Sequence, residues 1–292
     1  MTTPIKIATA QYDIGKLDDW THYEAKIGRW IDEAVGHNAK LLVFPEYFSM
    51  ELASLFPESV YRSLSGQLEA LQDLLPDFLA LFKKAAGTHA VTIVAGTFPV
   101  RENNNTYRNR AHVIHADGRV EHQDKVLMTR FENEQWFIHA GDHLKTFETD
   151  IGRIGINVCY DSEFPLLARQ QAEAGANIIV VPSCTDTLAG YWRVRIGCQA
   201  RALENQCYVI QSPTVGLAPW SEAVDVNIGA AAVYTPVDYG YPDNGVLAIG
   251  ELNQTQWVFA EIDPASVSQI RNTGQVFNYR DWPLHLRPLS QG

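Results

Sequence analysis

The sequence predicts an α/β fold in which two mixed β-sheets lie inside and helices lie outside. Short apolar runs typical of buried strands alternate along the chain with amphipathic segments typical of helices. A predicted hairpin interrupts this alternation, because residues 109–114 and 119–122 flank a turn at residues 116–118. Neighbouring antiparallel strands do not fit a purely parallel, doubly wound sheet, so mixed sheets are the better expectation.

The first half of the chain supplies five predicted strands, two of them in the hairpin, and two helical segments. Residues 5–11 alternate as a strand, and a helix with an apolar stripe at residues 27, 30, 31 and 34 follows. Residues 40–44 form a continuous apolar run, as expected of a strand buried on both faces. An amphipathic segment over residues 67–86, divided by Pro76, leads to a strand over residues 90–96, and the hairpin follows.

The second half repeats this pattern. Strands are predicted around residues 154–158, 177–182, 207–211, 230–235 and 256–262, and helices over residues 164–173 and 191–206. The tail after residue 277 is expected to be irregular but apolar enough to pack on something. No linker or repeat divides the chain of 292 residues. We therefore expect one domain over residues 1–275 and a C-terminal tail, 276–292, that is available to pack on a neighbouring subunit.

The composition of the chain excludes some classes of binding partner and indicates the cellular compartment. The net charge is −11 and no Lys/Arg cluster is present, which argues against nucleic acid and anionic membranes and favours a small-molecule substrate. The four cysteines form no disulfide framework, which fits a reducing compartment. The N-terminus lacks a signal-peptide pattern and every apolar run is too short for a membrane span. We expect a cytoplasmic protein.

Cys159 lies at a predicted junction between a strand and a helix. Asp161 or Ser162 can cap the following helix, and Pro165 fits its first turn. At the positive end of a helix a thiolate is favoured, and free backbone N–H groups can bind an oxyanion. The turn geometry alone leaves a small, buried structural cysteine as an equal alternative.

Two charged residues offer the remaining chemistry that a cysteine nucleophile needs. Glu46 follows Pro45 just past a buried strand, where partial burial raises a carboxyl pKa toward that of a general base. Lys125 enters an apolar stretch, where a buried ammonium needs a partner such as Glu132 or Glu134. Considered separately, Glu46 and Lys125 could each also be an ordinary solvated residue of a loop. No histidine pair has metal-ligand spacing, so we expect no metal and no cofactor.

Three stretches together resemble the nitrilase (carbon–nitrogen hydrolase) superfamily, in its amidase-like branch. They are Phe44-Pro45-Glu46-Tyr47, Asp124-Lys125-Val126-Leu127-Met128-Thr129 and Asn157-Val158-Cys159-Tyr160-Asp161. The resemblance implies a four-layer α-β-β-α sandwich and a homodimer or higher homo-oligomer. It also implies that Glu46, Lys125 and Cys159 are catalytic. The second glutamate of the family is expected at Glu132, with Glu134 as the alternative.

The resemblance implies a thiol-dependent hydrolase that cleaves a small linear amide through a cysteine thioester. Glu46 would take the Cys159 proton, while Lys125 and the Tyr160 N–H would hold the oxyanion. A nitrilase, an N-carbamoyl amine hydrolase and a non-catalytic binding module remain alternatives. Candidate substrate-binding residues lie on loops at strand ends: Tyr47, Tyr160, Glu163, Thr185, Tyr191 and Trp192. Glu163 and the negative charge point weakly to a basic group on the substrate.

Overall fold

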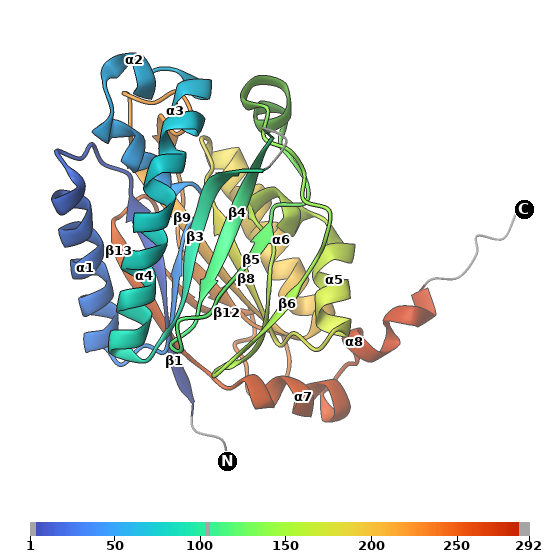
Figure 1. The fold of residues 1–292 in the computed structure, drawn as a ribbon. Helices are drawn as coiled ribbons and strands as arrows, with labels where there is room; N and C mark the ends of the chain where they lie inside the picture. Colours follow the sequence, from blue (N-terminus) through green and yellow to red (C-terminus); the bar gives the residue numbers. More distant parts are fainter. Residues whose placement is uncertain (1–3, 103–105, 286–292) are drawn as a thin grey trace, which may run out of the picture.

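Two mixed β-sheets packed face to face form the centre of the molecule, and helices cover the outer face of each sheet (Figure 1). The computed structural model describes residues 4–102 and 106–285. The architecture confirms the predicted α/β fold. The two sheets join through a short parallel pair, in which Tyr12 lies opposite Thr214 and Asp13 opposite Val215.

The first sheet has the strand order β5-β4-β3-β2-β1, with β13 on the other side of β1. Strands β1, β2 and β3 are parallel, and the remaining pairs are antiparallel. The strands are β1 (Ile5–Asp13), β2 (Leu41–Phe44), β3 (Thr92–Arg101), β4 (Tyr107–Ile114), β5 (Val120–Asp124) and β13 (Gln256–Ile262). The helical elements of this half are α1 (Trp20–Gly36), η1 (Phe48–Leu55), α2 (Glu58–Tyr61), α3 (Leu64–Leu71), η2 (Gln72–Leu74) and α4 (Leu75–His89).

The second sheet has the order β6-β7-β8-β9, continued by β11 and β12, and β7, β8 and β9 are parallel. Its strands are β6 (Thr146–Thr149), β7 (Gly152–Ile156), β8 (Ile178–Ser183), β9 (Tyr208–Leu217), β10 (Val226–Asn227), β11 (Ala232–Tyr234) and β12 (Val246–Ile249). The helical elements are η3 (Glu132–Trp136), η4 (Cys159–Glu163), α5 (Pro165–Glu173), α6 (Leu188–Asn205), α7 (Pro264–Thr273), α8 (Asn278–Asp281) and η5 (Trp282–His285).

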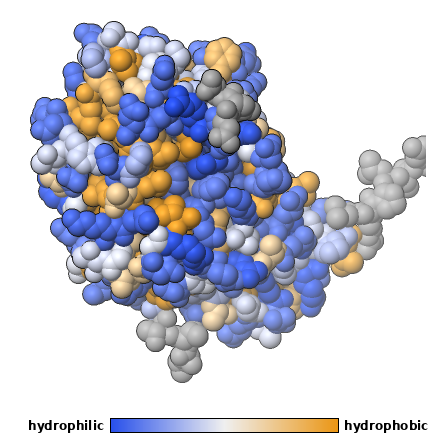
Figure 2. Space-filling model, viewed as in Figure 1, coloured by the Kyte–Doolittle hydropathy of each residue, from blue (hydrophilic) through white to orange (hydrophobic). Residues whose placement is uncertain are grey.

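Strand β2 shows why its sequence is apolar throughout. Leu41 and Val43 face the second sheet, whereas Leu42 and Phe44 face the helices of the first half. Successive side chains of a strand point to opposite faces, so a strand between two cores needs apolar residues at every position. Figure 2 shows the corresponding exterior, which is mainly hydrophilic with some apolar side chains gathered over the first half.

Three predictions about local structure need correction. Phe164 is the N-cap of α5 and makes no side-chain cap bond, because Asp161 and Ser162 lie in the separate 3₁₀ turn η4. Strand β12 lies between the strands predicted around residues 230–235 and 256–262, where no further strand was predicted. Residues 278–285 of the tail are helical rather than irregular, and Arg169 lies over the rings of Tyr279 and Trp282.

Pro76 divides the amphipathic segment as predicted, because it occupies the first turn of α4. Among the described residues, none of the helices is both long and apolar enough to cross a bilayer.

Gly96 fixes the close contact between β3 and the segment after β2. It has a positive φ of 52°, which favours glycine. An added Cβ would overlap the carbonyl oxygen of Pro45 and lie 2.7 Å from the ring of Phe48. The absence of a side chain at Gly96 therefore lets the carbonyl of Pro45 and the ring of Phe48, on either side of Glu46 in the chain, pack directly against β3.

We predict that Gly96→Ala lowers the free energy of unfolding by about 3 kcal/mol or more, because the added Cβ would overlap the backbone of Pro45 and the ring of the buried Phe48. Gly87→Ala in α4 is the matched control, since its Cβ would meet nothing closer than 3.6 Å. The control should stabilise the protein by about 0.5–1 kcal/mol. Urea denaturation measures both changes, and equal stabilities of the two variants would contradict the assignment.

Candidate active site

Four separated segments bring their predicted site residues to one cavity of about 560 Å³. Glu46 follows β2, Lys125 follows β5, Glu132 begins η3 and Cys159 begins η4, and all four line the cavity. The carboxyl ends of parallel strands meet at one edge of a sheet, which is where sites of α/β proteins form. The structure thus places the predicted carboxylate, ammonium and thiol together.

Lys125 lies between two carboxylates. Its Nζ is 2.9 Å from Oε1 of Glu46 and 2.6 Å from Oε2 of Glu132. All three side chains are at most 3% exposed. Burial alone would lower the pKa of Lys125, but the charges of Glu132 and Glu46 raise it well above its usual value. The lysine therefore remains an ammonium ion.

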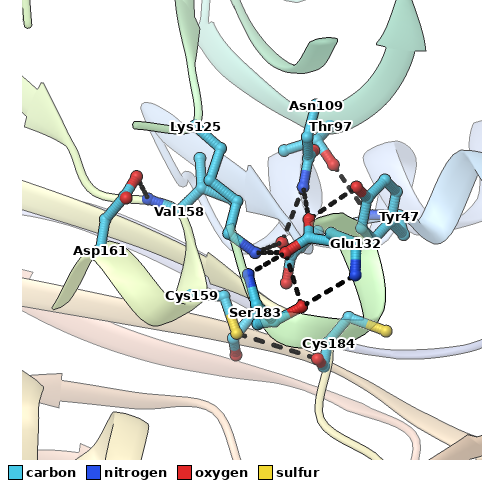
Figure 3. A network of polar contacts seen from close by, with 12 residues as sticks. Tyr47, Thr97, Asn109, Lys125, Glu132, Val158, Cys159, Asp161, Ser183 and Cys184 are labelled. Atoms are coloured by element: carbon cyan, nitrogen blue, oxygen red, sulfur yellow. Dashed lines mark hydrogen bonds and ion pairs between the residues drawn. The ribbon is translucent and has the colours of Figure 1, made fainter. Parts of the chain in front are cut away.

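Glu132 is surrounded by hydrogen-bond donors (Figure 3). Its Oε1 accepts from the Tyr47 hydroxyl at 2.8 Å and from Nδ2 of Asn109 at 3.1 Å. Its Oε2 accepts from Lys125 and from the N–H and Oγ1 of Thr129 at 3.0 and 2.9 Å. Burial opposes ionisation, but Lys125 and these donors hold the pKa of Glu132 below its usual value. Glu132 is therefore a fixed negative charge.

Glu46 has fewer donors than Glu132. Its Oε1 accepts from Lys125 at 2.9 Å and from Nδ2 of Asn109 at 2.8 Å, and Glu46 lines the same cavity as Cys159. Burial is the largest influence and raises the pKa of Glu46, the charge of Glu132 adds to the rise, and Lys125 opposes it. A carboxylate with a raised pKa beside a thiol is suited to act as a general base.

Cys159 lies in a strained conformation. Its φ is 49°, an uncommon value for a residue with a side chain, and the side chain is buried with Sγ 3.8 Å from the Cys184 carbonyl oxygen. The prediction of a thiolate is wrong for the resting site, although Cys159 does begin the short helical turn η4, ahead of α5. Burial and the charge of Glu46 raise the pKa of the Cys159 thiol. The resting residue is a neutral thiol that needs a base.

Asp161 connects the turn that holds Cys159 to the loop that holds Lys125. Its buried carboxylate accepts from the N–H groups of Leu127 at 2.8 Å, Val126 at 3.2 Å and Val158 at 3.1 Å. These contacts explain why Asp161 does not cap α5. This role was not predictable, because Val126 and Leu127 lie far from Asp161 in the chain.

The structure distinguishes the two candidates for the second glutamate. Glu132 contacts Lys125 directly, whereas Glu134 is exposed and forms a bidentate pair with Arg130 at 2.9 Å. Both lie in the short π-helical turn η3, so only the direction of the side chain separates them.

Four of the six predicted substrate-binding residues line the cavity, namely Tyr47, Tyr160, Glu163 and Thr185. Tyr191 and Trp192 do not line it. From α6 the lining residues are Gly190, Arg193 and Val194, which share one helical face by their i, i+3, i+4 spacing.

Tyr191 is instead buried with its hydroxyl bonded to Arg195, and Trp192 is 44% exposed. The charge of Glu163 is also not free, because Arg193 lies 3.4 Å from its carboxylate. Within residues 4–102 and 106–285, no cluster of three or more His, Cys, Asp or Glu side chains is arranged to hold a metal ion.

Asn109 is a site residue that the sequence reasoning missed. It lies on β4, is fully buried, and donates to both Glu46 and Glu132. Asparagine is disfavoured in strands, so its presence inside a predicted strand was the available signal.

Comparison with known proteins identifies the family of the chain. Residues 6–272 match the carbon–nitrogen hydrolase family. A Bacillus subtilis protein named "Probable hydrolase YhcX" is 34% identical over 95% of this chain, which spans only 53% of that protein's length. The 2-oxoglutaramate amidase of Bacillus subtilis is 29% identical, with 93% of this chain and 96% of that protein covered.

Among solved structures, Nit3 of Saccharomyces cerevisiae, described as a member of branch 10 of the nitrilase superfamily, is similar in fold. It has a TM-score of 0.73 and 22% identity over 94% of this chain and 95% of that chain. Because the family match covers most of the sequence, the chain belongs to the carbon–nitrogen hydrolase family.

Proposed function

We propose that this protein hydrolyses the C–N bond of a small linear amide through a thioester on Cys159. The observation that carries the proposal is the convergence of Glu46, Lys125 and Cys159 in one cavity. Membership of the carbon–nitrogen hydrolase family supports a hydrolase of non-peptide C–N bonds. The amidase names of several relatives support an amide as the substrate.

The first half-reaction forms the thioester. Glu46 accepts the thiol proton as Sγ attacks the amide carbonyl carbon, whose oxygen becomes an oxyanion. The C–N bond then breaks, Glu46 returns the proton to the leaving nitrogen, and ammonia or an amine departs. The thioester carries the acyl group.

The oxyanion needs donors that are in place before the reaction. The ammonium of Lys125 is held by two carboxylates, and the N–H of Tyr160 lies in the first turn of η4, where helical N–H groups lack internal partners. Each such donor typically contributes about 3–4 kcal/mol to the transition state. These two groups are the oxyanion hole of the proposal.

The second half-reaction uses Glu46 again. It removes a proton from water, the resulting hydroxide attacks the thioester carbonyl, and the thiol leaves with the proton from Glu46. Glu132 takes no part in these transfers, because its five hydrogen bonds hold it as the carboxylate that fixes Lys125.

We predict that Cys159→Ala abolishes ammonia release from amides and that Cys159→Ser nearly does so. Cys207→Ala is the control, because Cys207 is buried outside the cavity and should leave turnover within about threefold of the parent. The assay is a screen of ammonia release over linear amides, N-carbamoyl amines and nitriles.

The screen also separates the alternative functions. If the protein hydrolyses nitriles but not amides, it is a nitrilase and the proposal is wrong. If it hydrolyses only the N-carbamoyl amines, it is an N-carbamoyl amine hydrolase. Substantial amide turnover by Cys159→Ala would contradict the nucleophile. No turnover of any compound, together with no alkylation of Cys159 by iodoacetamide, would favour a binding module.

We predict that Glu132→Gln lowers kcat at least about 100-fold, because the buried Lys125 ammonium loses a charged partner and its fixed position. Glu134→Gln makes the same substitution at the exposed glutamate of the same η3 turn and should alter kcat less than about threefold. Steady-state kinetics on the best amide of the screen measures both. Equal losses in the two variants would contradict the assignment of Glu132.

A further inference from the structure

We infer that Asn109 is a positioning residue that leaves Oε2 of Glu46 as the atom that takes the thiol proton. The inference rests on the proposed function, because it concerns the proton transfer of the same site. Asn109 is fully buried on β4 and belongs to none of the sequence stretches that identified the site.

One amide nitrogen holds both glutamates. Nδ2 of Asn109 donates to Oε1 of Glu46 at 2.8 Å and to Oε1 of Glu132 at 3.1 Å. The orientation of the amide follows from chemistry, because ionised carboxylates only accept hydrogen bonds. The opposite orientation would place the amide oxygen against two carboxylate oxygens.

The two oxygens of Glu46 consequently differ. Oε1 accepts from both Asn109 and Lys125, so two donors already occupy it. The contacts among the described residues give Oε2 neither of these donors. Glu46 and Cys159 line the same cavity, so Oε2 is the oxygen of Glu46 with room for the thiol proton.

Asn109 also fixes the lysine. Its carbonyl oxygen accepts from the N–H of Lys125 at 2.9 Å. Its backbone is held in the sheet opposite Pro99 of β3. A single strand residue therefore sets both the start of the Lys125 loop and the rotation of the Glu46 carboxylate.

Donation to a carboxylate stabilises its charged form, so Asn109 lowers the proton affinity of Glu46 against the effect of burial. The other groups that act on Glu46 come from every neighbouring element. Lys125 favours its charge, whereas Glu132 opposes it, and Cys159 lies beside it as the proton donor. Tyr47 and Cys184 also lie within electrostatic reach, and both have a raised pKa, so they stay neutral at moderate pH.

The test follows the pH dependence of Cys159 alkylation by iodoacetamide, identified by mass spectrometry of the Cys159 peptide. In the parent protein the rate should fall as the pH drops through the raised pKa of Glu46, because a protonated Glu46 cannot accept the thiol proton. Asn109→Leu removes both donations at similar volume. It should move this fall in the alkylation rate, the acidic limb of the pH–rate profile, upward by about one pH unit or more. The free energy of a hydrogen bond to a charged group corresponds to at least that shift in pKa.

Asn109→Ser keeps one shorter donor and should give a smaller upward shift. It also carries the test alone if circular dichroism shows that Asn109→Leu does not fold. Asn205→Ser is the matched control, because Asn205 is another fully buried asparagine, on α6, and does not line the cavity. The control should leave the acidic limb unchanged.

The inference is overturned if both Asn109 variants are alkylated more slowly at every pH while the acidic limb stays at the pH of the parent protein. Asn109 would then only contribute to packing. Alkylation needs no amide, so the result is independent of the proposed function. A failed amide screen with a shifted alkylation limb would reject the function and keep the role of Asn109.

Discussion

The buried Lys125 ammonium between Glu46 and Glu132 is the interaction on which the rest of the site depends. A charge taken out of water is costly unless it is paired and hydrogen-bonded, and Lys125 is both. Two carboxylates beside one ammonium leave one excess negative charge. The hydrogen-bond donors around each carboxylate decide which of the two stays ionised more readily. Glu132 accepts five hydrogen bonds, so Glu46 is left as the carboxylate that can take up a proton.

The sandwich holds this cluster through backbone contacts at several sequence-distant points. The absence of a side chain at Gly96 lets the residues on either side of Glu46 pack against β3, and the carbonyl of Asn109 fixes the start of the Lys125 loop. Asp161 ties that loop to the turn of Cys159. Such restraints keep reacting groups within a narrow range of geometry, which is a large part of what an enzyme contributes.

Much of the fold was predictable because its signals are local. The apolar run of β2 and the residues around the β4–β5 turn identify their own structure, and Glu46 and Cys159 follow strands that are easy to recognise. The partners of Asn109 and Asp161 were not predictable, because these contacts form only when segments far apart in the chain come together in the fold. Tyr191 and Trp192 lie outside the cavity lining, because the sequence does not show which face of a helix turns toward a cavity.

The neutral state of Cys159 was misjudged for a related reason. Its pKa depends on burial and on Glu46, which are properties of the assembled site. A neutral thiol with a neighbouring base makes Cys159 reactive only when a proton acceptor and a carbonyl carbon are both in place. Reactivity in this site is therefore a property of the cluster as a whole.

The most direct test of this account is the mass of the protein quenched with acid during steady-state turnover of an amide. The account predicts an intact mass raised by the acyl part of the substrate, with the added group on the peptide that contains Cys159. Turnover with no acyl adduct under conditions where thioester hydrolysis limits the rate, or an adduct on another residue, would contradict it.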